Sequence, residues 1–423
     1  MLNGMQSVII ATLTIRSLFF KRLFMEVIDK HAPLRVFHSP QAPKPWMSPN
    51  IEMYINNRNA AYNKWSKTKN LGDLEYYRAI RNRTKQVIRN AKIVYAHSLF
   101  NNVNSSKEMW KNLKKLKVVN KPKSNTSGPD PDALNAHYAK SEVLDGNLVQ
   151  SKIDFYEAQP KLVTDDNKFY FKNVGPEAVW KTINSIGSNA KGIDGITVQM
   201  LKYCLCEITP VLLHICNYSL QHCTFPQLWK IAVVKPIPKV INPKIPKDYR
   251  PISLLSVLSK VLEKIVHDQV IQYLETSSLL NPSQSGFKKG HSTDSALLKV
   301  SGDLRKAMDN RLLSILVLYD FSNAFPSVHH DLLLSKLRWM GFSETSVAWF
   351  KAYLTGRLQK VLFNDLESCL LPILLGVPQG SIHGFILITL ILCSNIQKVT
   401  CMLTIFRTIY LFNLGCLTSA LIY

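Results

Sequence analysis

Hydrophobic residues along the chain form two kinds of pattern, one typical of strands and one typical of helices. Leu312 to Tyr319 is an apolar run broken only by Ser314, and its length and β-branched residues predict one buried strand. Residues 256–276 instead place apolar side chains along one face of a predicted helix, which an ordinary core-packing role explains. These side chains are Val257, Leu258, Val261, Leu262, Ile265, Val266, Val270 and Leu274.

Shorter patterns of the same two kinds surround these elements. Phe169 to Val174 and Ile231 to Val234 are predicted as short strands, and Pro176 to Ser188 as a helix with proline at its first position. The segments Gln359–Asn364 and Cys369–Leu374 are expected to pair as a hairpin. The mixture of helices with a small antiparallel sheet predicts an α+β fold class.

The first 25 residues are apolar and basic, with no acidic residue before Glu26. This composition is compatible with an organelle transit peptide, but no cleavage pattern follows it. Two apolar helices interrupted by Arg16, Lys21 and Arg22 are the preferred interpretation. The proline-rich stretch HAPLRVFHSPQAPKPWMSPN then predicts an extended linker, so that residues 1–50 form one N-terminal segment.

Residues 51–120 are predicted to be a basic helical region. Between Ile51 and Lys117 the chain has fifteen lysines and arginines, four acidic residues and no proline. Basic side chains follow phosphates and aromatic side chains stack on bases, so this region is a candidate for binding nucleic acid. The alternative is a solvated helical hairpin whose aromatics pack along its own seam. The aromatics in question are Tyr62, Trp65, Tyr76, Tyr77, Tyr95 and Trp110.

The overall charge supports a polyanionic partner. Lysine and arginine number 52 against 29 acidic residues, a net charge of +23, which favours nucleic acid first and an acidic membrane surface second. No apolar run is long enough to cross a bilayer, and no membrane association is expected. The eight cysteines contain no CxxC pair and no zinc-ribbon spacing, so they are interpreted as reduced thiols of an intracellular protein.

Asp320 directly follows the predicted strand Leu312–Tyr319. An ionised carboxylate at the end of a buried strand is unfavourable unless a positive group meets it, and a divalent metal ion is the usual partner in a cleft. The same residue is also suited to cap a helix that starts near Ser322. The strand alone leaves both interpretations open.

Seven motifs decide between them. In chain order they are KGIDGI, FPQLWK, KPIPK, DYRPISLL (an expected extended turn), NPSQSGFKKGHST, YDFSNAFPSV and GVPQGS. Their order over roughly half of the chain resembles the reverse transcriptase of non-LTR retrotransposons, in particular the jockey-like kind of insects and other invertebrates. Residues 45–116 are similar to the basic connector that such elements place between endonuclease and polymerase, and the endonuclease itself is expected to be missing.

The resemblance implies RNA-templated DNA synthesis, with an RNA template, a DNA primer and deoxynucleoside triphosphates as partners. This reaction is an in-line displacement at phosphorus, in which two Mg²⁺ ions stabilise the attacking and leaving oxygens. Asp320 matches the first metal-binding aspartate of the family. The family also implies an intracellular ribonucleoprotein, in the nucleus or the cytoplasm.

The other motifs imply contacts with the incoming nucleotide. Phe325 matches the aromatic residue that lies against the sugar, and Gln379 matches the residue that lies over the nucleotide. Gly380, together with Gly376, lets the backbone approach it. Arg250 matches the arginine that holds the triphosphate, and Lys239, or else Lys235, adds charge there. The fingers segment expected to line the template path is Ser285, Gly286, Phe287, Lys288 and Lys289.

The resemblance fails at the second carboxylate motif. The family has an aromatic-Ala-Asp-Asp tetrad in a hairpin, whereas this chain reads TIFRTIYLFN, with Arg407 and Thr408 in that place and Ile409 to Phe412 as the returning strand. No aspartate or glutamate follows Glu367. Without these carboxylates two Mg²⁺ ions are not held, so the chain is expected to be inactive, truncated and degenerate at its C-terminus.

The expected organisation is therefore a right-hand polymerase without a thumb. A flexible linker at 121–174 precedes fingers at 175–310, and a partial palm follows at 311–423. Three hypotheses remain: a reverse transcriptase, a catalytically dead nucleic-acid-binding remnant, and a non-functional fragment with an exposed palm edge and apolar tail. The carboxylate count favours the second for this chain.

Overall fold

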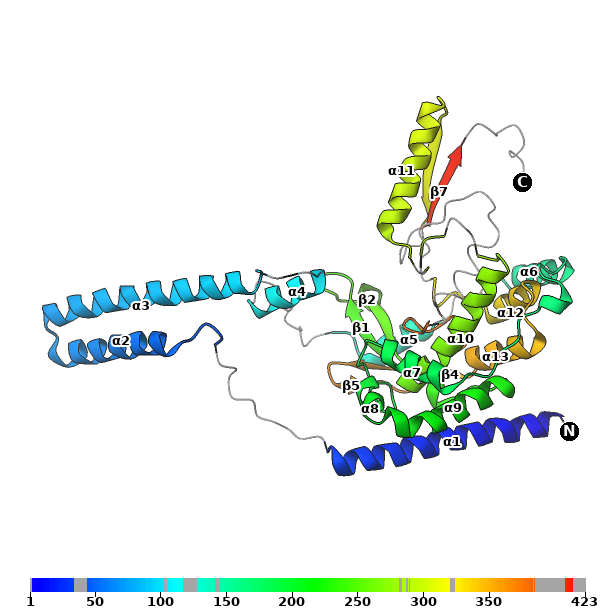
Figure 1. Cartoon of the computed structure of the whole chain (residues 1–423), viewed down its shortest axis with the longest axis horizontal. Coiled ribbons are helices and arrows are strands. Elements are labelled where there is room, and N and C mark those ends of the chain that lie inside the picture. The colour runs from blue at the N-terminus through cyan, green and yellow to red at the C-terminus, as the bar shows by residue number, and fades with distance from the viewer. Residues whose placement is uncertain are drawn as a thin grey trace. The chain divides into compact units, whose positions relative to one another are not determined.

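The computed structural model describes residues 2–33, 44–101, 103, 105–116, 128–140, 145–280, 284–286, 288, 290–319, 324–382, 384 and 408–413. The contacts divide the chain into two compact units (Figure 1). One unit, hereafter the arm, is Pro33–Asn125. The other, hereafter the main unit, combines Met1–Ala32 with Thr126–Tyr423.

The arm is helical, as its pattern predicts. Its helices are α2 (Pro49–Thr68), α3 (Leu71–Ser98) and α4 (Ser106–Lys115). Helix α2 has proline in its first turn, and its N-cap Ser48 accepts a hydrogen bond from the Ile51 amide. Helices α2 and α3 pack against each other as a hairpin. Local capping and periodicity are thus enough to define this unit.

The N-terminal segment is one continuous helix, α1 (Leu2–His31), so the prediction of two interrupted helices is wrong. Its basic residues do not break it, because Arg16 lies against helix α9 (Leu205–Gln221). Its guanidinium contacts Nε2 of His214 at 2.6 Å and lies 4.6 Å from the ring centre of Tyr218. Phe20 is buried on the same packed face.

The larger sheet of the main unit has the strand order β2-β1-β4-β5, and β6 also pairs with β4. Strands β1 and β2 are antiparallel, whereas β1 and β4 are parallel, with Ile231 opposite Leu358. Strand β1 is longer than predicted, and DYRPISLL forms a strand rather than an extended turn. The strands are β1 (Ile231–Pro238), β2 (Tyr249–Leu254), β4 (Arg357–Phe363), β5 (Leu366–Glu367) and β6 (Leu371–Ile373).

The hairpin predicted before GVPQGS is confirmed, because β4 pairs with β6 in antiparallel register, with Gln359 opposite Leu371. Strand β5 pairs with the end of β4 through a tight turn at Asn364 and Asp365. Both turn residues have positive φ (51° and 63°), as a type I′ hairpin turn requires. Asparagine and aspartate tolerate this conformation better than other side chains.

The helices of the main unit form a layer with its own hydrophobic core, whereas the sheet residues Val234, Tyr249 and Val361 form a separate buried cluster with Leu134. The helix predicted over 256–276 is confirmed as α10, whereas the helix predicted to end at Ser188 ends at Ser185. Trp229, Trp349 and Tyr353 are among the largest fully buried side chains. The layer contains α7 (Pro176–Ser185), α8 (Val198–Tyr203), α9, α10 (Val257–Thr276), α12 (His330–Trp339) and α13 (Glu344–Leu354); the short 3₁₀ helices are η1 (Asp165–Asn167), η2 (Gln227–Lys230) and η3 (Pro246–Asp248).

The strand predicted at 169–174 does not form, apart from one isolated bridge between Phe169 and Phe342. The amide of Lys172 donates to the Gln269 side chain at 2.9 Å. The amide of Val174 donates to the Asn217 side chain, also at 2.9 Å. Side-chain amides on helices therefore bind the backbone groups that a neighbouring strand would have used.

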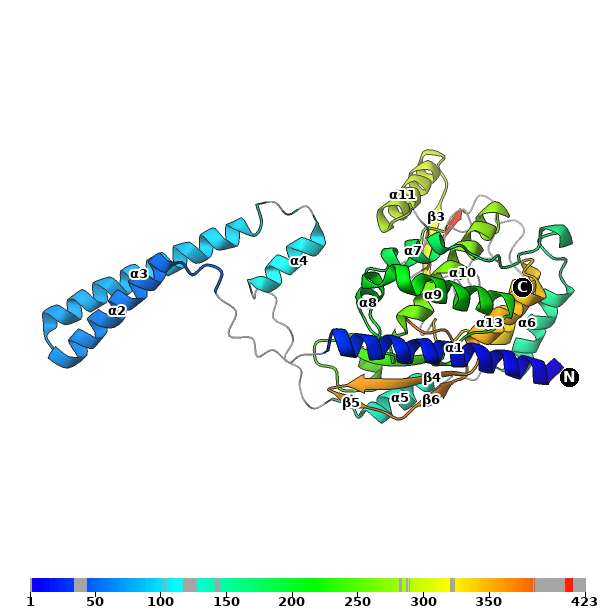
Figure 2. The same ribbon diagram turned by 60° about the horizontal axis from the view of Figure 1, so that its bottom comes forward.

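The segment expected as a flexible linker differs from that expectation, since it contains α5 (Pro131–Ala139) and α6 (Gly146–Ala158). Helix α5 packs on β4 and β6 (Figure 2). Its Asn135 is fully buried and donates to the Cys369 carbonyl at 2.8 Å, and Gln359 donates back to Asn135 at 3.0 Å. A polar residue thus anchors the helix, which hydrophobic periodicity did not indicate.

A second sheet pairs β3 (Ser314–Tyr319) with β7 (Thr408–Asn413) in antiparallel register. This confirms the strand predicted before Asp320 and the returning strand predicted after Thr408. Helix α11 (Thr293–Asp309) leads into β3. Ile315 and Leu316 remain 47% and 43% exposed, so this part of β3 is not the buried strand expected.

Candidate nucleotide-binding cleft

A cleft in the main unit is lined by strands of the larger sheet, by helix α5 and by the loop that carries GVPQGS. The sequence predicted that Phe325 and Gln379 lie together, and both line this cleft. The full lining is Tyr138, Ala139, Lys140, Lys230, Ala232, Pro251, Ser253, Phe325, Pro326, Arg357, Leu358, Gln359, Ile373, Leu375, Val377, Pro378 and Gln379.

Backbone hydrogen bonds join the GVPQGS loop to the turn that carries Phe325. The Gly376 amide donates to the Val328 carbonyl at 2.8 Å, and the Val377 amide donates to the Phe325 carbonyl at 2.9 Å. Nε2 of His330 lies 2.8 Å from the Gly376 carbonyl. These bonds hold Phe325, which is only 8% exposed, in the wall of the cleft.

The same loop is joined to β2 and α10. The Ser253 amide donates to the Gln379 carbonyl at 2.8 Å, and the Ile382 amide donates to a Glu263 carboxylate oxygen, also at 2.8 Å. Glu263 is fully buried and accepts a second hydrogen bond from the Ser259 hydroxyl. Burial raises the pKa of Glu263 above its usual value. The loop therefore connects strand, helix and turn.

Two glycines permit this close packing. Gly376 has φ of 83°, and a Cβ there would lie 2.6 Å from the Pro326 Cα. Gly380 has φ of 133°, and a Cβ there would lie 2.5 Å from the Ser253 carbonyl oxygen. Both positions require glycine for conformation and for space.

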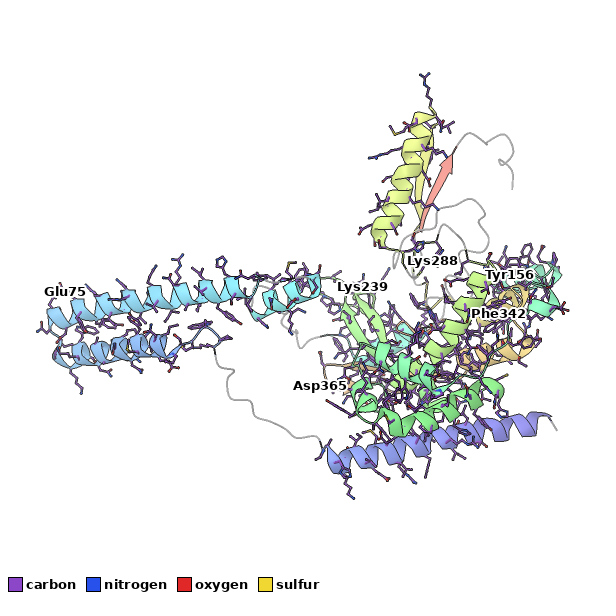
Figure 3. The ribbon with its side chains drawn as sticks, in the orientation of Figure 1. Glu75, Tyr156, Lys239, Lys288, Phe342 and Asp365 are labelled. Carbon is purple, nitrogen blue, oxygen red and sulfur yellow. The ribbon has the colours of Figure 1, made fainter. Side chains whose placement is uncertain are left out.

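Arg250 and Lys239 lie at the loop end of the β1–β2 hairpin, where Figure 3 labels Lys239. Arg250 is exposed and pairs with Ile237 across the hairpin. The Lys239 ammonium donates to the Lys247 carbonyl at 3.1 Å. The cleft lining includes Pro251 of β2 but neither of these two cations. The structure thus brings Phe325 and Gln379 together and leaves Arg250 and Lys239 beside the cleft.

Two cations that sequence reasoning did not select line the cleft. Arg357 is 2% exposed and Lys230 is 5% exposed. Burial and the nearby Arg357 lower the pKa of Lys230 to about 8. In the sequence Lys230 is one of three lysines around β1, and nothing distinguishes it from the other two. The residues around Arg357, TGRLQ, match no motif that indicates a binding role.

Helix α5 contributes a polar wall. The Tyr138 hydroxyl is buried without a hydrogen-bond partner among the described residues, and burial raises the pKa of Tyr138. Burial lowers the pKa of His137, and Lys239, Lys140 and Lys247 lower it further. The local potential around α5 is therefore positive.

Part of the predicted site lies outside the described residues. This holds for Asp320, for Phe287 and Lys289 of the template segment, and for Arg407. Of the remaining template segment, Ser285, Gly286 and Lys288 are half-buried in the stretch before α11, and the Gly286 carbonyl accepts a hydrogen bond from Gln284 at 3.0 Å. Lys288 is labelled in Figure 3.

Potential metal-ligating side chains are scattered over the described part of the chain. Within these ranges no three histidine, cysteine, aspartate or glutamate side chains gather closely enough to hold a metal ion. The register of the second sheet pairs Tyr319, which precedes Asp320, with Thr408, which follows Arg407. The strand opposite β3 therefore begins with threonine after arginine, and neither is a metal ligand of the kind that Mg²⁺ prefers.

Three of the six aromatic residues named for the arm, Tyr62, Trp65 and Tyr77, pack against one another. The Trp65 and Tyr77 rings are nearly parallel with centres 6.1 Å apart, and Tyr62 contacts both. This agrees with the alternative in which the aromatics fill the helical seam. Tyr76 and Trp110 are different, since they are 59% and 51% exposed.

Hydropathy gives no membrane-spanning candidate, because none of the helices in the described part of the chain combines the necessary length with sufficient apolar character. This includes α1, whose apolar residues are interrupted by basic ones.

Comparison with known proteins gives a consistent result. Residues 237–410 match the family model described as reverse transcriptase (RNA-dependent DNA polymerase). The chain is 32% identical over 215 residues to the probable RNA-directed DNA polymerase from transposon BS of Drosophila melanogaster, covering 50% of this chain and 24% of that protein. It is 27% identical over 290 residues to the RNA-directed DNA polymerase from mobile element jockey of the same species, covering 65% and 31%. The chain thus spans about a quarter to a third of these relatives.

Proposed function

Since the chain belongs to the reverse transcriptases of jockey-like non-LTR retrotransposons, we propose that it binds nucleotide and nucleic acid but does not polymerise. The family activity is RNA-templated DNA synthesis from an RNA template, a DNA primer and deoxynucleoside triphosphates. What this chain retains is the binding part of that activity.

The observation that carries the proposal is the β3–β7 pairing. In the register Tyr319 lies opposite Thr408, and in the sequence Asp320 follows Tyr319 while Arg407 precedes Thr408. A polymerase needs several carboxylates at one point to hold two metal ions. Arginine in place of a carboxylate repels Mg²⁺, and no acidic residue follows Glu367 in the sequence. Asp320 is left as one carboxylate of an incomplete set.

Nucleotide binding is supported by the cleft. Phe325 and Gln379 line it together, and Gly380 brings the loop backbone against β2. We assign Phe325 to the sugar and Gln379 to the face of the incoming nucleotide. Arg250 and Lys239, at the nearby hairpin end, are assigned to its triphosphate because both present cations to solvent there.

Nucleic-acid binding is supported by charge. The net charge of +23 and the exposed cations of the arm favour a polyanion with strong salt dependence. The segment 285–289 precedes α11 and contains two lysines, and we assign it to the template strand. The family cofactor is Mg²⁺, and the described residues contain no group of three potential metal ligands.

Primer extension on an RNA template, with Mg²⁺ or Mn²⁺, tests the proposal. The expected result is no incorporation by the full chain, together with salt-sensitive RNA binding. Asp320→Ala is the matched control, and it should change neither result. Incorporation that disappears in Asp320→Ala would overturn the inactivity, because an unidentified carboxylate would then complete the site. Loss of RNA binding at low salt would overturn the binding role.

A further inference from the structure

We propose that Lys230 and Arg357 form a phosphate-binding pocket at the base of the cleft, separate from Arg250 and Lys239. The ligand class is a phosphate group, which a nucleotide or a nucleic-acid strand supplies. The proposed function is needed only to name a nucleotide or a nucleic-acid strand as the molecule that supplies this phosphate. The pocket itself rests on strand register, burial and unsatisfied donors.

Strand register brings the two cations together. Strands β1 and β4 are parallel, and their pairing starts with Ile231 opposite Leu358. Lys230 and Arg357 immediately precede these two residues, so they stand side by side at the start of the paired strands. A Cβ on Gly356, the residue before Arg357, would lie 3.9 Å from the Lys230 ammonium, so the lysine side chain extends beside the start of β4. Like charges placed closely destabilise each other's charged form, and an anion bound between them would relieve this repulsion.

Most of the Arg357 donors are unused. Its Nε donates to the Tyr353 carbonyl at 2.8 Å, and its guanidinium lies 4.2 Å from the centre of the Tyr353 ring. Its Nη1 and Nη2 are buried and make no hydrogen bond among the described residues. Buried donors of a charged group are unfavourable when unpaired, so a ligand that accepts hydrogen bonds from them is stabilised.

A nearby carboxylate does not neutralise the pair. Glu263 interacts electrostatically with Arg357, but no ion pair within 4.0 Å links it to Arg357 or Lys230 among the described residues. Its oxygens accept from Ser259 and Ile382 instead. The base of the cleft therefore keeps an excess of positive charge.

A third unused donor lines the same cleft. The Tyr138 hydroxyl is buried without a partner among the described residues, and Tyr138 comes from α5. Guanidinium, ammonium and hydroxyl groups together offer donors from three elements. A tetrahedral oxyanion that only accepts hydrogen bonds matches this set, and arginine binds phosphate oxygens in a bidentate manner.

Thermal unfolding of the full chain with added pyrophosphate tests the pocket at constant ionic strength. The wild type should show a saturable rise in Tm. Lys230→Met and Arg357→Met should weaken the apparent affinity roughly ten- to hundredfold, as expected for charged hydrogen bonds. Lys351→Met, which removes an exposed lysine on α13, is the charge-matched control and should leave the affinity unchanged.

A structural role for the two cations predicts a different result, namely a changed Tm without a change in the pyrophosphate response. That result, or no saturable response in the wild type, overturns the proposal. If either methionine variant fails to fold, Tyr138→Phe decides, because it removes only a hydroxyl and should weaken binding roughly fivefold. An unchanged affinity in Tyr138→Phe and in every folded cation variant also overturns it.

Competition identifies the source of the phosphate. Displacement of pyrophosphate by dATP assigns the pocket to the nucleotide, and displacement only by a ten-nucleotide single-stranded RNA assigns it to a strand. Both outcomes support the pocket, and displacement by neither overturns it. Since no step requires polymerisation, failure of the primer-extension result leaves this test intact.

Discussion

The arm and the cleft of the main unit both carry positive charge, but they present it in opposite ways. Helices α2 and α3 expose their lysines and arginines, while the cleft buries Lys230 and Arg357 between strand ends and α5. Exposed cations exchange freely with counterions and attract any polyanion, with strong salt dependence. Buried cations have fixed positions and unused donors, so they select a group of one size and geometry. Positive charge alone therefore does not distinguish non-specific attraction of a polyanion from selective binding of one chemical group.

The largest expected effect is a loss of stability when the tightly packed GVPQGS loop of the cleft is changed. A similar substitution in the arm should not have this effect. Gly376→Ala should destabilise the main unit by about 3 kcal/mol, because it combines positive φ with a backbone contact at 2.6 Å. Gly72→Ala in helix α3 should instead stabilise the arm by about 0.5 to 1 kcal/mol, since the new Cβ would lie 3.8 Å from Oδ1 of Asn70, an ordinary contact distance. Urea unfolding followed by circular dichroism measures both. Equal effects would mean that the loop is not the rigid part of the cleft.

The next effect separates packing from base stacking in the arm. Trp65→Ala should destabilise the arm by about 2 kcal/mol, because Trp65 packs against Tyr62 and Tyr77 in the seam. Tyr76→Ala, at a 59% exposed position, should change stability by less than about 0.5 kcal/mol. Protease resistance of the arm and RNA affinity are both measured. If Trp65→Ala lowers RNA affinity without changing protease resistance, the aromatic seam is a binding surface after all.

A smaller effect tests the exposed charge itself. Replacing Arg78, Lys85 and Arg89 with glutamine should lower the salt slope of single-stranded RNA binding by about 2, since each phosphate contact contributes about 0.7. RNA affinity in about 0.1 M salt should fall roughly tenfold. Lys230→Met with Arg357→Met is the control and should change the slope by less than about 1. If the salt slope instead falls mainly in Lys230→Met with Arg357→Met, the cleft rather than the arm supplies the salt-dependent contacts with RNA.

The smallest effect concerns a buried histidine of the main unit. Burial in α10, with help from Lys264, lowers the pKa of His267 to about 4, from an ordinary value near 6.5. The folded state thus favours the neutral ring, so this contribution to stability is complete above pH 6.5 and is lost as the pH falls towards 4. Unfolding free energy should drop by about 1 kcal/mol between pH 7 and pH 5.

His267→Gln should remove that part of the pH dependence while leaving the response to urea at pH 7 similar. Denaturant titrations at the two pH values give the comparison. An unchanged drop in His267→Gln would assign the acid sensitivity to another group.

Local sequence patterns determined much of the fold. Apolar spacing predicted α10, the β4–β6 hairpin and the strand before Asp320, because each depends on residues close together in the chain. Ordered motifs also predicted that Phe325 and Gln379 share a site, and both line one cleft. Their roles, and that of Asp320 outside the described residues, remain predictions.

Only the tertiary structure decided where distant polar groups meet. The predicted strand at 169–174 is replaced because Gln269 and Asn217 bind its backbone, and α5 is fixed because Asn135 binds Cys369. Lys230 and Arg357 become neighbours only through the parallel pairing of β1 with β4. Hydrophobic periodicity records which face of an element is buried, whereas these contacts depend on the register between elements far apart in sequence, which no local pattern contains.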